Sequence, residues 1–259
     1  MRSHRSLESR FAFLAAVASL SLAACGGGGS DDSATPPEGG KPSAPLASPV
    51  AGVWAGTVPS NGNRILAVVL EDGSMLAPYT TGSGEPDGLL HGNLVANGGA
   101  VSATSLSDYR WRSSAVFSAS MSGSYSGQQL SGTIVYSGGD RLSATLIRVP
   151  GHDRPVVVKD FQGTWVGEVA QPGVFWRGAT ALVAGEGSVK IPLLGGCSFV
   201  GQLVSRGDAS AADLTASFEG GACTGLPLKG VAIIIDGSLT LAAVGRDPAT
   251  ATVARLQRK

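Results

Sequence analysis

The side chains in this chain that are best suited to covalent chemistry are three cysteine thiols, Cys25, Cys197 and Cys223. A thiol can join a disulfide, bind a metal or take a modification, so its position decides its chemistry. The histidines are scattered and suggest no metal or cofactor site: His4, His91 and His152. Because the sequence contains no G-x-S-x-G or H-E-x-x-H motif, a hydrolase is the least favoured hypothesis, and we predict that the protein is not an enzyme.

Cys25 directly follows a short apolar run near the N-terminus. Three arginines and one acid precede that run, and Phe11–Ala24 is apolar except for two serines. A run of 14 residues is too short to cross about 30 Å of hydrocarbon as a stable helix. Residues 1–24 are therefore predicted to be a removable export signal. One alternative is an ordinary signal peptide cut near Ala24, which would leave Cys25 free to join a disulfide.

Leu22–Cys25, with the sequence Leu-Ala-Ala-Cys, resembles the lipobox of bacterial lipoproteins. The resemblance implies that the chain is cut before Cys25 and that its thiol is acylated. It also implies the outer membrane, because Gly26 is not the aspartate that retains such proteins in the inner membrane. Residues 25–50 are rich in Gly, Ser and Pro, which predicts a flexible tether. We expect a lipid-anchored protein of the cell envelope.

Charge and the remaining cysteines are consistent with that location. Of the 19 basic and 19 acidic residues, 3 and 1 lie in residues 1–24, which leaves a net charge of about −2 and no basic stripe. Nucleic-acid binding is therefore not expected. Outside the cytosol, Cys197 and Cys223 are expected to form a disulfide worth roughly 3–4 kcal/mol. Two buried free thiols are the alternative.

An internal repeat divides the rest of the chain. Gly52–Val58 reappears as Gly163–Val169, and Gly92–Gly98 reappears as Gly201–Gly207. Two further pairs of blocks match in the same order: Arg64–Tyr79 with Ala179–Leu193, and Gly132–Gly139 with Gly230–Gly237. Ordered matches of this kind indicate a duplicated module. We predict one copy over residues 51–149 and another over 162–259, joined by a linker over 150–161.

Each copy is expected to form about eight short strands joined by glycine-containing turns such as Asp72-Gly73. Eight sequential antiparallel strands can close on themselves and remove both exposed edges. The predicted fold is therefore all-β, with two tandem small antiparallel up-and-down β-barrels. The expected strands are 53–58, 64–70, 74–79, 89–95, 100–106, 115–124, 129–136 and 141–148, then 164–170, 175–184, 188–193, 198–205, 211–219, 228–235, 238–244 and 250–256.

Both copies open with the pattern G-x-W-x-G, which resembles the first strand of lipocalin and avidin-like barrels. The resemblance implies that Trp54 and Trp165 close one end of each barrel. It also implies that a basic residue of the last strand packs over each ring, with Arg148 and Arg255 as the candidates. The whole chain resembles proteobacterial lipoproteins built from tandem modules of this kind, and this second resemblance implies no particular activity.

Two other tryptophans, Trp111 and Trp176, lie beside arginines in segments expected to be loops or strand ends. Exposed aromatic and arginine side chains are enriched where partners dock, so both are candidate partner contacts. Packing at the barrel rim is the alternative. Three acidic residues are expected to be solvated in turns: Asp87, Asp108 and Asp153.

The favoured functional hypothesis is an envelope lipoprotein that acts as a binding or interaction module, with a protein, a glycan or another envelope component as its partner. The alternative is a carrier of a small apolar ligand, since an eight-stranded barrel either is filled by side chains or holds one small molecule. The shortness of the modules favours a filled interior.

Overall fold

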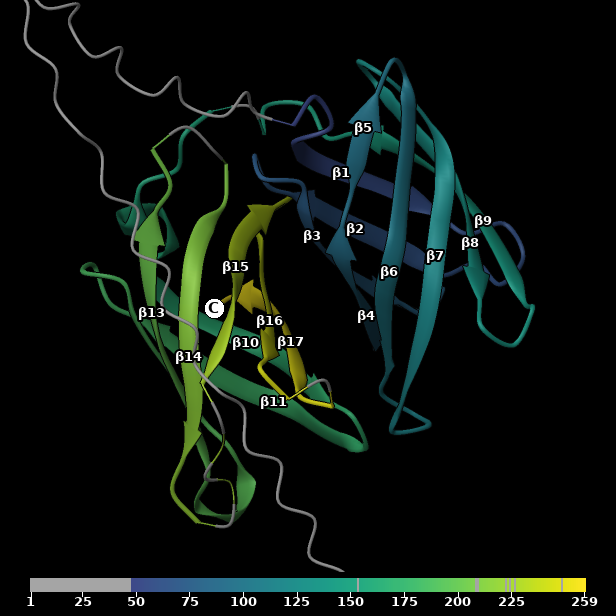
Figure 1. The fold of residues 1–259 in the computed structure, drawn as a ribbon. Helices are drawn as coiled ribbons and strands as arrows, with labels where there is room; N and C mark the ends of the chain where they lie inside the picture. Colours follow the sequence, from purple (N-terminus) through teal and green to yellow (C-terminus); the bar gives the residue numbers. More distant parts are fainter. Residues whose placement is uncertain are drawn as a thin grey trace, which may run out of the picture. The chain divides into compact units, whose positions relative to one another are not determined.

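A computed structural model describes residues 48–152, 154–207, 210–221, 223, 225, 227–247 and 249–259. This part of the chain folds into two closed antiparallel barrels of eight strands each (Figure 1). Both barrels belong to one compact unit, residues 45–259. The predicted signal peptide, Cys25 and nearly all of the tether lie outside the described residues.

The first barrel follows the chain in simple up-and-down order and closes by pairing β4 with β6. The short β5 pairs with β6 outside this closed ring. The strands are β1 (Gly52–Thr57), β2 (Arg64–Val69), β3 (Ser74–Thr80), β4 (Pro86–Asn93), β5 (Val95–Asn97), β6 (Ala100–Arg110), β7 (Ala115–Ser126), β8 (Gln129–Tyr136) and β9 (Arg141–Arg148).

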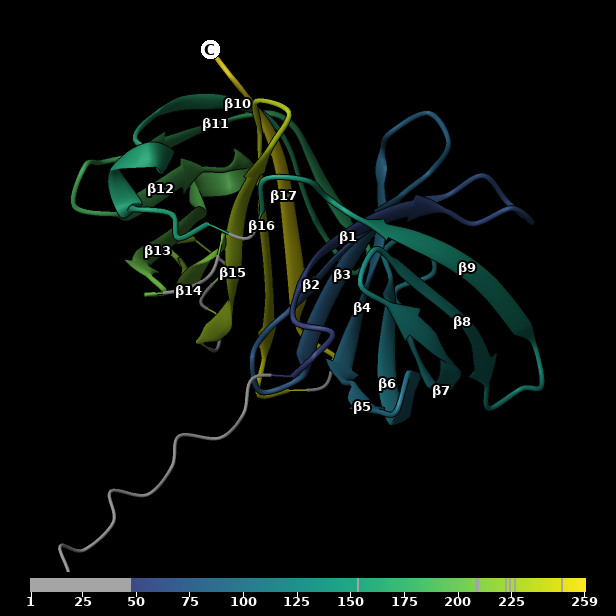
Figure 2. The same cartoon turned by 90° about the horizontal axis from the view of Figure 1, so that it is seen from above.

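The second barrel closes by pairing its first strand with its last (Figure 2). Two short 3-10 helices accompany it, η1 (Val158–Phe161) and η2 (Leu194–Gly196). The strands are β10 (Gly163–Gln171), β11 (Val174–Val183), β12 (Ser188–Pro192), β13 (Ser198–Ser205), β14 (Ala212–Glu219), β15 (Leu228–Ile235), β16 (Ser238–Gly245) and β17 (Ala251–Arg258).

The predicted fold of two tandem eight-stranded barrels is confirmed, but one block of the repeat was matched incorrectly. Gly132–Gly139 begins within β8, the seventh strand around the first barrel, whereas Gly230–Gly237 begins within β15, the sixth strand of the second. The structural counterpart of β8 is β16. The two blocks look alike because each places a glycine in the strand and another in the following turn, so sequence matching shifted by one strand.

A buried tryptophan closes one end of each barrel. Trp54 and Trp165 have no exposed surface, and their indole Nε1 atoms donate hydrogen bonds to the backbone oxygens of Val50 and Phe161, both at 2.9 Å. Arg148 lies over the Trp54 ring, with its Cζ 4.8 Å from the ring centroid. The two copies therefore share the same seal, in which an arginine covers the tryptophan.

In the second barrel, Arg258 covers the tryptophan, and the expectation for Arg255 was wrong. Arg258 pairs across the strands with Trp165, and its Cζ lies 4.5 Å from the ring centroid. Arg255 lies three residues earlier on β17, so it points to the opposite face of the strand. There it donates through Nη1 to the backbone oxygen of Gly84, at 3.0 Å, in the first barrel.

The glycines of the G-x-W-x-G pattern make room for these seals. Gly52 has a φ of +138°, and a Cβ at this position would lie 3.0 Å from Nη1 of Arg148. A Cβ on Gly56 would lie 2.3 Å from the backbone oxygen of Thr145 on the neighbouring strand, which is too close for any side chain. The pattern is therefore explained by packing within the barrel.

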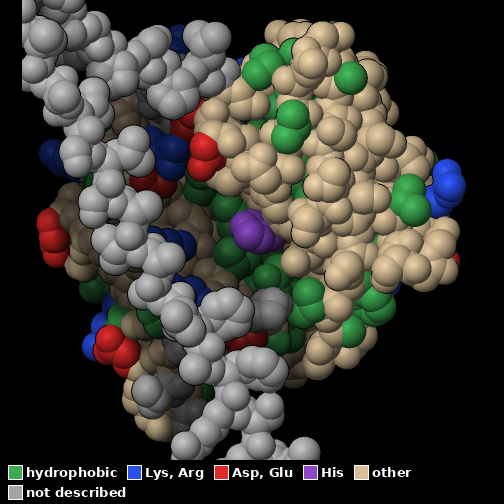
Figure 3. All heavy atoms as spheres, in the orientation of Figure 1, with side chains coloured by type: hydrophobic (Ala, Val, Ile, Leu, Met, Phe, Trp, Pro, Cys, Tyr) green, Lys and Arg blue, Asp and Glu red, His purple; other side chains and the backbone are tan. Residues whose placement is uncertain are grey.

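Serine and threonine side chains cover much of the outer surface of the first barrel. Ser122 on β7 lies opposite Thr133 on β8, which in turn lies opposite Ser143 on β9. The hydroxyls of Thr133 and Ser143 are 2.9 Å apart. Figure 3 shows the face around β6 and β7 as largely tan, with few charged side chains. This alternation explains why a segment with few large apolar residues still forms a strand with one buried face.

Outward-facing apolar residues of the two barrels are buried together in a shared cluster. Arg177 of the second barrel also pairs with Glu85 of the first, at 2.7 Å, and Arg206 pairs with Glu71. The buried members are Val53, Val68, Leu76, Leu89, Tyr109 and Trp111 from the first barrel, with Ala170, Ala211, Val231, Ile233, Ala242, Ala251 and Val253 from the second.

Candidate functional site

Four polar or charged side chains meet inside the first barrel, at the end opposite the Trp54 seal. Strands β3, β6 and β8 all run toward this end, and each contributes residues near its last position. We call Tyr79, Asp108, Arg110 and Tyr136 the Asp108 cluster. All four line the same cavity, which we call the mouth of the first barrel.

Asp108 is the centre of the cluster. It is 1 % exposed, and both of its carboxylate oxygens accept hydrogen bonds. Tyr79 donates to Oδ1 at 2.7 Å, Tyr136 donates to Oδ2 at 3.0 Å, and Nε of Arg110 donates to Oδ2 at 2.9 Å. A buried carboxylate requires such compensation. The expectation that Asp108 is solvated in a turn was therefore wrong.

Two aromatic rings pack against the guanidinium of Arg110. Its Cζ lies 4.4 Å from the ring centroid of Phe117 and 4.9 Å from that of Tyr136, which are favourable cation–π distances. Burial acts to lower the pKa of Arg110, but its interactions with Asp108 and Tyr136 outweigh burial and raise that pKa. The side chain is still 41 % exposed, so the charged group faces the mouth.

The two tyrosines remain protonated donors. Burial, and then the charge of Asp108, raise the pKa of Tyr136 to about 12. Burial, followed by the same carboxylate, also raises the pKa of Tyr79 above its usual range. Both hydroxyls therefore keep their protons near neutral pH, and the cluster is a stable neutral unit made of one anion, one cation and two hydroxyls.

The cluster borders a cavity of about 300 Å³. Apolar side chains form much of its wall: Val58, Ile65, Ala77, Leu90, Ile134 and Leu142. The polar rim includes Asn61, Asn63, Asp87, Asp140 and Arg141. A filled interior was expected from the shortness of the modules, and that expectation does not hold at this mouth.

Asp87 belongs to the rim and not to a turn, since it lies on β4. Its carboxylate accepts from Nδ2 of Asn63 at 3.2 Å and from Nε of Arg112 at 3.1 Å. Arg112 also pairs with Glu85 at 2.8 Å. These bonds tie the β3–β4 and β6–β7 connections together beside the mouth. Asp153 lies outside the described residues.

The corresponding end of the second barrel is apolar. Gly92 pairs with Leu106 in the first barrel as Gly201 pairs with Ala216 in the second, so Phe218 occupies the position of Asp108. By the same counting Gly220 replaces Arg110. Pairing of Met75 with Gly92 and of Val189 with Gly201 places Leu193 where the first barrel has Tyr79. The two copies thus share the same strand pairing at this end but differ in the side chains that it carries.

Aromatic packing occupies this end of the second barrel. Trp176 is partly buried and stacks on Phe218 with 6.2 Å between ring centroids, and Phe199 meets Phe218 edge-on at 5.3 Å. Trp176 therefore packs at the rim, which was the alternative to a partner contact.

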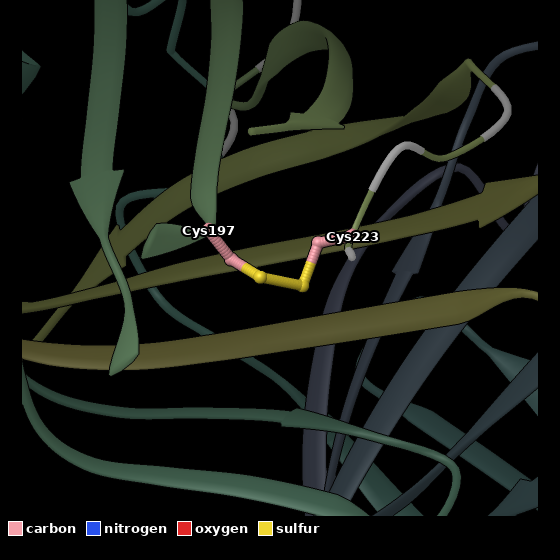
Figure 4. The surroundings of a disulfide bond; sticks show 2 residues. All are labelled: Cys197 and Cys223. Atoms are coloured by element: carbon pink, nitrogen blue, oxygen red, sulfur yellow. A yellow bond between two sulfur atoms is a disulfide. The ribbon is translucent and has the colours of Figure 1, made fainter. Parts of the chain in front are cut away.

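The predicted disulfide between Cys197 and Cys223 is present at the same end (Figure 4). The Cα atoms are 5.6 Å apart. Cys197 immediately precedes β13, and Cys223 lies in the connection that follows β14. The bridge therefore fixes that connection to the start of the neighbouring strand.

Trp111 is not an exposed residue. It has no accessible surface and belongs to the cluster buried between the barrels. Its backbone oxygen accepts a hydrogen bond from the amide of Gly173, at 2.8 Å, in the second barrel. The expected partner contact is therefore a contact between the two halves of this chain.

Comparison with protein-family models, with curated proteins and with solved structures found no match for this chain. Within the described residues, no helix is both long and apolar enough to cross a membrane. In the same part of the chain, no group of three or more His, Cys, Asp or Glu side chains could hold a metal ion.

Proposed function

We propose that the first barrel binds a small amphipathic molecule in its mouth. The observation that carries this proposal is the cavity of about 300 Å³, in which an apolar wall surrounds a fixed and internally neutralised charge pair. Binding sites for small molecules are typically preformed, mostly apolar cavities with a few convergent polar groups. The volume lies at the small end of the usual range, so the ligand is small.

Two observations support our choice of a ligand carrier over a protein or glycan interaction module. Trp111 and Trp176 were the candidate partner contacts of the interaction hypothesis, and both are used in packing within the chain. By contrast, Arg110 faces the cavity with its position already set by Asp108. A preorganised polar group beside an apolar wall favours a ligand that has both characters.

Filling the mouth is expected to abolish binding. Leu142 on β9 lines the cavity, so Leu142→Trp would occupy the space of the ligand. Binding is measured by the fluorescence increase of the neutral probe N-phenyl-1-naphthylamine added to the purified full chain, and we expect at least about tenfold weaker binding, which is a loss of about 1.4 kcal/mol.

Ile147→Trp is the matched control, since Ile147 lies on the same strand, is 51 % exposed and faces outward. It should bind the probe as the natural chain does. Equal binding by both variants, or no binding by the natural chain, would contradict a ligand site in this mouth.

We also propose that acylated Cys25 anchors this binding protein in the cell envelope, at the outer membrane. The lipobox-like sequence Leu22–Cys25 supports the anchor, and the disulfide is consistent with an oxidising compartment. Incorporation of labelled palmitate in cells is expected to be lost completely in Cys25→Ser and unchanged in Ser30→Ala. Label retained by Cys25→Ser would refute the anchor.

A further inference from the structure

We infer that the ligand is a small carboxylic acid with an apolar tail, and that its carboxylate binds the guanidinium of Arg110. This inference rests on the proposed binding of a small molecule in the mouth of the first barrel. It adds the chemical class of the ligand and the residue that selects it.

Asp108 cannot recognise the ligand directly. Its two oxygens already accept three hydrogen bonds, from Tyr79, Tyr136 and Arg110, and the residue is 1 % exposed. A cationic ligand would have to displace Arg110 to reach this carboxylate. The role that fits these contacts is to hold Arg110 and the two hydroxyls in position.

Arg110 keeps part of its guanidinium available. Its ion pair with Asp108 runs through Nε, and no second carboxylate among the described residues lies within ion-pair distance of it. The Tyr136 hydroxyl also interacts with this guanidinium, but a guanidinium carries five N–H donors, so its terminal nitrogens keep donors that can bind a ligand. A guanidinium presents such donors as a planar fork that matches a carboxylate with two parallel hydrogen bonds.

The charged residues around the mouth leave Arg110 available to an anionic ligand group. Asp87 is already engaged by Asn63 and Arg112, and Asp140 is exposed in the turn between β8 and β9. Arg141, the other rim cation, forms no ion pair with a described carboxylate. Asp140 and Arg141 both line the cavity and offset each other on the rim. A carboxylate entering the mouth would thus pair with Arg110, and its tail would meet Ile65, Ala77 and Leu90 in the wall.

The test compares an acid with the alcohol of the same chain length. Octanoate and 1-octanol are titrated against N-phenyl-1-naphthylamine bound to the purified full chain. We expect octanoate to displace the probe at least about tenfold more tightly than 1-octanol, because only the carboxylate can form a charge-assisted pair with Arg110; tenfold corresponds to about 1.4 kcal/mol. The double variant Asp108→Asn/Arg110→Met should lose this preference and still bind the neutral probe. Arg246→Met, which removes an exposed arginine of the second barrel, should keep the preference.

The outcomes separate the two proposals. Probe binding together with an octanoate preference that only the double variant loses would support the carboxylate inference. Equal displacement by octanoate and 1-octanol, or a preference that survives in the double variant, would overturn that inference and leave the ligand site intact. Failure of the probe and of both competitors to bind the natural chain would overturn both.

Discussion

Replacing Trp111 by alanine is expected to lower the free energy of unfolding by about 3–5 kcal/mol. The side chain has no accessible surface and lies in the apolar cluster shared by the two barrels. Its loss would leave a large cavity where the barrels meet, and that cavity could collapse only if the barrels shifted. Guanidinium denaturation of the purified full chain, followed by circular dichroism, measures the change.

Trp176→Ala is the comparison for Trp111→Ala. Trp176 is only partly buried and stacks on Phe218 in the second barrel, so its replacement should cost clearly less. If Trp111→Ala left stability unchanged but removed a binding partner, Trp111 would be a docking residue and the burial argument would be wrong.

The position of Trp111 illustrates which part of the fold was hidden from the sequence. A residue in the turn after a barrel strand is normally solvated, and two adjacent arginines, Arg110 and Arg112, made this segment look exposed. The barrels, however, bury their outward faces against each other. A signal for this burial exists in the second barrel, where Val231–Ile235 and Leu239–Val244 are nearly continuous apolar runs. Such runs indicate strands buried on both faces.

Features set by local sequence were predicted well. The duplication and the eight strands of each barrel follow from glycine positions and turns that each segment carries itself, and the tryptophan seals were implied by the resemblance of the G-x-W-x-G pattern to lipocalin and avidin-like barrels. Arg148 was placed correctly, but Arg255 was chosen in place of Arg258. Two residues that are three positions apart on a strand point to opposite faces. Only the register of β17 against β10 shows which arginine lies on the same face as Trp165.

The Asp108 cluster was missed because of a β-bulge. Val101 and Ala103 point inward on β6, and simple alternation from them would direct Asp108 outward. The register shifts between Ala103 and Leu106, so Leu106, Asp108 and Arg110 point inward instead. A bulge of this kind redirects every later side chain of its strand. The sequence showed no sign of it, and the strand was expected to end at residue 106.

Arg110→Met is expected to lower the free energy of unfolding by about 3 kcal/mol. The substitution removes the cation and leaves Asp108 buried, with only the hydroxyls of Tyr79 and Tyr136 to compensate its charge. Removing one partner of a buried pair costs far more than the pair itself contributes, because the remaining charge stays away from water. Denaturant unfolding at neutral pH measures this change.

The double variant Asp108→Asn/Arg110→Met separates that penalty from the packing of Arg110 against Phe117. An asparagine at position 108 can accept from Tyr79 and donate to Tyr136, so removing both charges should bring stability back to within about 1 kcal/mol of the natural chain. The Asp108–Arg110 pair would then contribute little net stability, which is the pattern expected of residues retained for binding. If the single and double variants were equally unstable, Arg110 would stabilise the fold through its contacts with the aromatic rings. The buried charge of Asp108 would then not be the cause of the lost stability.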